Sequence, residues 1–146
     1  MILTSLLLAA VKPTTLPPAK VADVVAAAGD CFEAAAARKV NTVHLKKAGW
    51  VEVEPADGKY FRREGVSARI VALDNVCSLV APVARFDDVQ AVLLQVDDVV
   101  KPDHIEEVKQ GILLTKGARK VLFYVGSPTV EAAPAVRIDV MYSESR

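Results

Sequence analysis

The residues that carry most enzyme chemistry and metal binding are scarce in this sequence. Its 146 residues include two cysteines and two histidines, and no motif supports a serine or cysteine nucleophile with a histidine. The seven glycines are scattered singly, so no glycine-rich loop can be recognised for binding phosphate. These scarcities do not exclude an enzyme, but they leave no specific enzyme class indicated, and we predict neither a bound metal nor a cofactor.

The sequence also lacks an excess of charge and a long hydrophobic run. Eighteen basic and eighteen acidic side chains give a formal net charge of zero, so no overall field attracts nucleic acid. The apolar run 2–11 is far shorter than the roughly 20 residues that a helix needs to cross a bilayer. We therefore predict a protein that neither binds nucleic acid nor spans a membrane.

The apolar N-terminal run predicts export. Residues 1–10 resemble the hydrophobic region of a secretory signal peptide cleaved after Ala10, although no basic residue precedes it. Residues 11–18 are rich in threonine and proline, which is typical of a linker. The expected location is periplasmic or secreted. The alternative is a cytoplasmic protein in which 1–10 forms a core strand.

Residues 19–146 are predicted to form a single α+β domain. Apolar residues at spacings of three and four indicate a helix that ends near Arg38, and Asn41 can cap a short second helix. From Trp50 onward the apolar residues alternate, which is typical of strands, with Asp74 and Asn75 at a hairpin turn.

A second long amphipathic helix and further strands complete the predicted domain. The helix is expected to begin at a cap on Asp87 and to end at Pro102. A short helical piece is expected over 104–110, before strands in "ILLT", "KVLFYV" and "AVRIDVMY". The predicted fold is a mainly antiparallel sheet of meanders and hairpins with two longer helices packed on one face.

The two cysteines both fall on predicted buried faces. Cys31 lies in the apolar stripe of the first helix, and Cys77 shares a strand face with Leu79 and Ala81. In an oxidising compartment we expect a disulfide between Cys31 and Cys77, whereas in the cytoplasm the alternative is two buried thiols. A nucleophilic role for Cys31 is disfavoured because it lies well inside the helix, away from the N-terminal dipole.

Two polar segments remain as candidate sites. The acidic segment "DDVVKPDHIEE" fits neither a calcium loop nor a zinc helix, and we interpret it as solvated residues with Asp103 as a helix cap. The segment "KYFRR" combines basic and aromatic residues, and Tyr60, Arg62 and Arg63 are candidates for partner contact. The exposed edge of "AVRIDVMY" is a second candidate.

The sequence thus favours a small exported protein that binds a protein or envelope component without catalysis. One alternative is a hydrolase whose site we do not recognise. Another is a cytosolic regulatory domain, if 1–10 is a core strand.

Overall fold

The computed structural model describes residues 17–53, 59–124 and 134–143. The predicted signal peptide and linker residues 11–16 lie outside these ranges, so the export hypothesis stays a prediction. The helices are α2 (Val21–Ala34), α3 (Thr42–Lys47) and α4 (Phe86–Val100). The strands are β1 (Val51–Val53), β2 (Lys59–Arg62), β3 (Arg69–Leu73), β4 (Val76–Pro82), β5 (His104–Glu107), β6 (Gly111–Lys116), β7 (Arg119–Tyr124) and β8 (Ala135–Tyr142).

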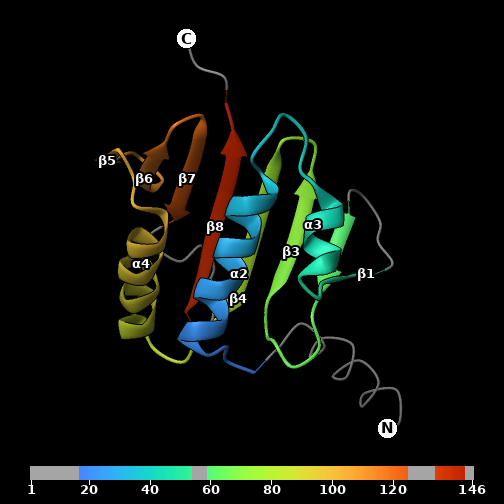
Figure 1. Cartoon of the computed structure of the whole chain (residues 1–146). Helices are drawn as coiled ribbons and strands as arrows, with labels where there is room; N and C mark the ends of the chain where they lie inside the picture. The colour runs from blue at the N-terminus through green and yellow to red at the C-terminus, as the bar shows by residue number, and fades with distance from the viewer. Residues whose placement is uncertain (1–16, 54–58, 125–133, 144–146) are drawn as a thin grey trace, which may run out of the picture.

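The eight strands form one antiparallel sheet in the order β1-β2-β3-β4-β8-β7-β6-β5. Strands β1 to β4 follow one another across half of the sheet, and β5 to β7 follow one another across the other half. Strand β8 lies between the two halves and pairs with β4 and β7. The helices α2, α3 and α4 lie on the same side of the sheet (Figure 1). The predicted α+β class and the packing of the two longer helices on one face are confirmed.

The core lies between α2, α4 and the helix-covered face of the sheet. In β4 every second side chain is fully buried, beginning with Cys77, and the intervening side chains are only partly buried. The same alternation in β8 buries Val136, Ile138 and Val140. In α4 the residues Val92, Val96 and Val100 recur every four positions and are buried.

Helix α2 ends earlier than its sequence predicts. Alanine favours helix continuation through 35–37, yet the last helical residue is Ala34. The following segment turns so that Val40 is buried and donates its N–H to the carbonyl of Asp74 at 2.8 Å. The C-terminus of α2 is stabilised from β7, where Arg119 donates to the Phe32 carbonyl at 3.0 Å.

The prediction for the short second helix is confirmed. The side chain of Asn41 accepts a hydrogen bond from the His44 N–H at 3.1 Å, which caps α3. Gly49 has a φ of +100°, and the next N–H, of Trp50, donates to the Leu45 carbonyl. The indole of Trp50 is buried and donates to Asp30 in α2 at 2.9 Å.

The predicted helical piece at 104–110 is wrong. Residues His104–Glu107 form β5, which pairs with β6, and a tight turn links Val108 to Gly111 through hydrogen bonds in both directions. Pairing with β6 satisfies backbone groups that the ends of so short a helix would leave without partners. Asp103 is accordingly no helix cap, because its carboxylate accepts from the Gly117 N–H at 3.0 Å.

The predicted start of α4 is also wrong, by two residues. The N-cap is Arg85, whose N–H donates to the Asp88 carboxylate at 3.3 Å, whereas Asp87 lies inside the first turn. The helix dipole favours the carboxylates of both Asp87 and Asp88 in the first turn. The composition of this segment therefore does not show which residue is the N-cap.

Candidate binding surface

The two cysteines form a disulfide that ties α2 to β4. Their Cα atoms are 5.5 Å apart, and both residues are fully buried. The prediction of a Cys31–Cys77 bond is therefore confirmed. A structural disulfide is consistent with an oxidising compartment outside the cytoplasm.

The opposite face of the sheet, here called the open face, has no described helix or strand packed against it. Its side chains are those that the strand register places away from α2. They form an apolar band with charged residues at its centre and margins. In β1 to β4 they include Val51, Val53, Tyr60, Arg62, Arg69, Val71, Leu73, Val76, Ser78 and Val80. In β5 to β8 they include His104, Glu106, Leu113, Lys120, Leu122, Tyr124, Arg137, Asp139 and Met141.

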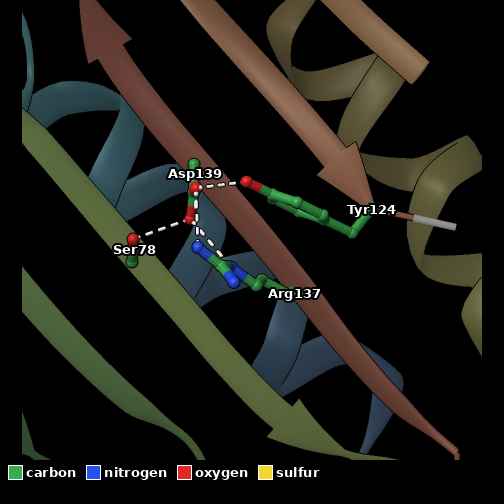
Figure 2. A network of polar contacts seen from close by, with 4 residues as sticks. All are labelled: Ser78, Tyr124, Arg137 and Asp139. Carbon is green, nitrogen blue, oxygen red and sulfur yellow. Dashed lines mark hydrogen bonds and ion pairs between the residues drawn. The ribbon is translucent and has the colours of Figure 1, made fainter. Parts of the chain in front are cut away.

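A polar network lies at the centre of the open face (Figure 2). Asp139 in β8 is only 6% exposed, and its carboxylate accepts from the hydroxyl of Ser78 in β4 at 2.6 Å. It also accepts from the hydroxyl of Tyr124 in β7 at 2.9 Å and from both Nε and Nη2 of Arg137, at 3.4 and 3.2 Å. One buried carboxylate thus joins three neighbouring strands.

The network fixes the charge states of its outer members. Burial raises the pKa of the Tyr124 hydroxyl above 10.0, and the hydrogen bond to Asp139 and the charge of that carboxylate raise it further. Burial acts to lower the pKa of Arg137, but the hydrogen bond and charge of Asp139 outweigh it, so the pKa is raised. The guanidinium of Arg137 also lies 4.3 Å from the centroid of the Tyr124 ring. At neutral pH a neutral phenol and a cation therefore flank the carboxylate.

The hydrogen bonds within the polar network limit the chemistry that is available to Asp139. Ser78 donates to a carboxylate that three other donors already occupy, so Asp139 has little capacity to act as a general base. His104 lies three strands away in β5, about 14 Å at normal strand spacing, where its ring contacts Glu106. The network holds Arg137 and Tyr124 in fixed positions on the surface, which is what a binding contact requires.

The predicted contact residues separate into two groups. By register, Tyr60 and Arg62 lie on the open face of β2. Arg63 follows the strand, and its side chain lies against Gly49 at the end of α3, where an added Cβ would come within 3.2 Å of the Arg63 Nε. The other candidate, "AVRIDVMY", is the central strand β8 and has no free edge, so the prediction of an exposed edge there is wrong.

The residues that the structure describes show no cluster of metal ligands and only shallow surface hollows. No group of three or more histidine, cysteine, aspartate or glutamate side chains among those residues could hold a metal ion. One shallow hollow is formed by residues 107–112 at the β5–β6 turn. Another is bordered by Arg38, Asp74, Asn75 and Tyr142. No helix within the described residues is long and apolar enough to cross a membrane.

Comparison with known proteins gives no relative from which a function could be transferred. No family model matches the sequence, and no significant match is found among curated proteins or solved structures.

Proposed function

We propose that this protein is an exported, non-catalytic binding module that recognises a protein partner through the open face of its sheet. The observation that carries the proposal is the asymmetry of the sheet. The helices pack on one face, whereas the other presents a band of valine, leucine and tyrosine side chains around a fixed Arg137–Tyr124 pair.

The size and composition of the open face suit a protein interface. Eight strands at about 4.8 Å spacing and about five residues of strand length give roughly 650 Å². A standard interface buries about 800 Å² on each partner, so the open face approaches that size. Val51 and Leu73 are 63% and 48% exposed, which leaves apolar surface for a partner to cover.

Export is supported by the disulfide and by the N-terminal sequence. A buried Cys31–Cys77 bond is stable in the periplasm or outside the cell, whereas glutathione and thioredoxin keep most cytosolic thiols reduced. The apolar run 2–11 and the proline-rich stretch after it favour cleavage near Ala10. Together with the disulfide, they favour a periplasmic or secreted mature protein.

Site-specific photo-crosslinking in the native host tests the binding surface. A photoreactive amino acid is placed at Val71 on the open face and, in a matched control, at Leu94, which is 65% exposed on α4. We expect a discrete adduct with another protein from position 71 and none from position 94. Adducts from position 94 alone, or from neither position, would contradict the proposal.

The N-terminus of the protein isolated from the same cells tests export. A mature chain that begins near Val11 in the periplasmic or secreted fraction is the expected result. An intact Met1 in the cytoplasmic fraction would contradict export. The crosslinks at positions 71 and 94 would still test the binding surface independently.

A further inference from the structure

Two arginines lie directly opposite each other on the open face. Arg62 in β2 is the register partner of Arg69 in β3, so their Cβ atoms are about 4.5–5.5 Å apart. Like charges in this position destabilise an antiparallel pair. A second structural feature adds to the cost, because the Nε of Arg62 is buried without a hydrogen-bond acceptor.

No described carboxylate neutralises this pair. Only Asp139 and Glu106 place a carboxylate on the open face within the ranges that the structure covers, by strand register. Asp139 is occupied by Arg137 and by two hydroxyls, and Glu106 lies at the far edge beside His104. Arg137 has a carboxylate partner in Asp139, whereas the Arg62–Arg69 pair has no carboxylate partner among the described residues.

The surroundings of the two arginines are apolar. Their register neighbours across the sheet are Val51 in β1 and Val80 in β4, and Val71 is the next open-face residue of β3. A partner that covers this area must bury aliphatic side chains and supply negative charge together. Arginine pairs carboxylates with two parallel hydrogen bonds, and such bonds are stronger where apolar groups exclude water.

We propose that the Arg62–Arg69 pair binds carboxylate side chains of a protein segment in which acidic and apolar residues are interspersed. This inference rests on the proposed function, because it names the chemistry of the partner for the same open face. A second copy of this chain does not fit. With its carboxylates at Asp139 and Glu106 already engaged, a face-to-face dimer would bury the arginines unpaired. A nucleic acid fits less well, because phosphodiesters gain little from the valines.

Peptide selection on the purified full chain tests the inference without a known partner. The probe is a displayed library of random peptides of about twelve residues, panned on the wild type and on the Arg62→Gln/Arg69→Gln variant. A matched control, Lys39→Gln/Lys47→Gln, loses the same formal charge from exposed sites outside the strands of the open face. Urea unfolding checks folding, and the arginine variant should match or exceed the wild type because repulsion is relieved.

The wild type and the lysine control should enrich peptides that interleave aspartate or glutamate with valine, leucine or isoleucine. A selected peptide should bind the arginine variant about tenfold more weakly than it binds the wild type. Replacing the acidic residues of that peptide with glutamine or asparagine should weaken its binding to the wild type by a similar factor. Equal enrichment of acidic peptides on the arginine variant, or no acidic enrichment, would overturn the inference. So would preferential binding of a single-stranded oligonucleotide.

Failure of the two proposals can be told apart. Crosslinks from position 71 together with no acidic preference would leave the open face as a binding surface and reject the role of the arginines. Absence of crosslinks from position 71 would reject the binding surface itself.

Discussion

The disulfide offers the most quantitative test of the fold, through the variant Cys31→Ala/Cys77→Ala. The bonded residues are 46 positions apart, and the entropy of closing a loop of that length in the unfolded chain corresponds to about 4 kcal/mol. Both cysteines are fully buried, so removing their sulfur atoms leaves a cavity that costs about 1 kcal/mol more. We expect the variant to lose about 5 kcal/mol of unfolding free energy, which corresponds to a fall of about 15 °C in Tm.

Urea unfolding followed by tryptophan fluorescence measures this loss directly. Trp50 is the only tryptophan and is 2% exposed, so its emission reports global unfolding. Wild type reduced while unfolded and refolded in reductant separates the two contributions, because it lacks the crosslink but keeps both sulfur atoms. The reduced protein should lose about 4 kcal/mol, and the slope of free energy against urea should rise because the uncrosslinked chain exposes more surface.

An unfolding free energy within about 0.5 kcal/mol of the wild type would refute the loop-closure argument. Alkylation provides an independent check on the bond itself. Denatured, unreduced protein should take up no thiol label, and uptake of two labels would show that Cys31 and Cys77 are not bonded in solution.

Three further predictions concern the polar contacts. Asp139→Asn should lower the free energy of unfolding by about 2–3 kcal/mol, because the amide NH2 cannot accept the hydrogen bonds that a carboxylate oxygen accepts from Tyr124 or Arg137. Urea titration measures this loss, with the exposed Glu106→Gln as control. A smaller loss for Asp139→Asn than for the control would contradict the bracing role. The raised pKa of Tyr124 stabilises the fold below pH 10, and this stabilisation is lost as pH rises through the folded-state pKa. Between pH 9 and 12 the free energy of unfolding should therefore fall more steeply with pH for the wild type than for Tyr124→Phe. Parallel curves for the two proteins would contradict the raised pKa. Arg119→Met should cost about 1–2 kcal/mol by loss of the Phe32 carbonyl bond and the ring contact, and an unchanged Tm in calorimetry would exclude this capping role.

Much of the fold could be predicted because burial sets a clear period in most elements. The alternation in "VCSLVAPV" and "AVRIDVMY" places every second residue against the helices, as observed in β4 and β8. The segment 104–107 lacks that signal, because all four residues are exposed. An edge strand held mainly by backbone hydrogen bonds leaves little trace in the side-chain pattern, so the acidic residues of this segment are equally typical of a helical turn.

The candidate site could be predicted only in part, for a related reason. Strand alternation correctly places Asp139 on the face opposite the core, where an acidic residue is expected to be solvated. Its burial depends on Ser78 and Tyr124, which lie 61 and 15 positions away and meet it only after the sheet has formed. The one local signal is Arg137, two residues earlier on the same face of the strand.

The central position of β8 has a consequence for the order of folding. Strands β1 to β4 and β5 to β7 can each pair from near neighbours in sequence, but the two halves of the sheet meet only through β8. Until Ala135–Tyr142 joins the sheet, the inner edges of β4 and β7 lack the strand with which they pair in the folded protein. Strand β8 therefore converts two partial sheets with unpaired edges into one sheet, in a closure that brings together segments distant in the sequence and is entropically costly.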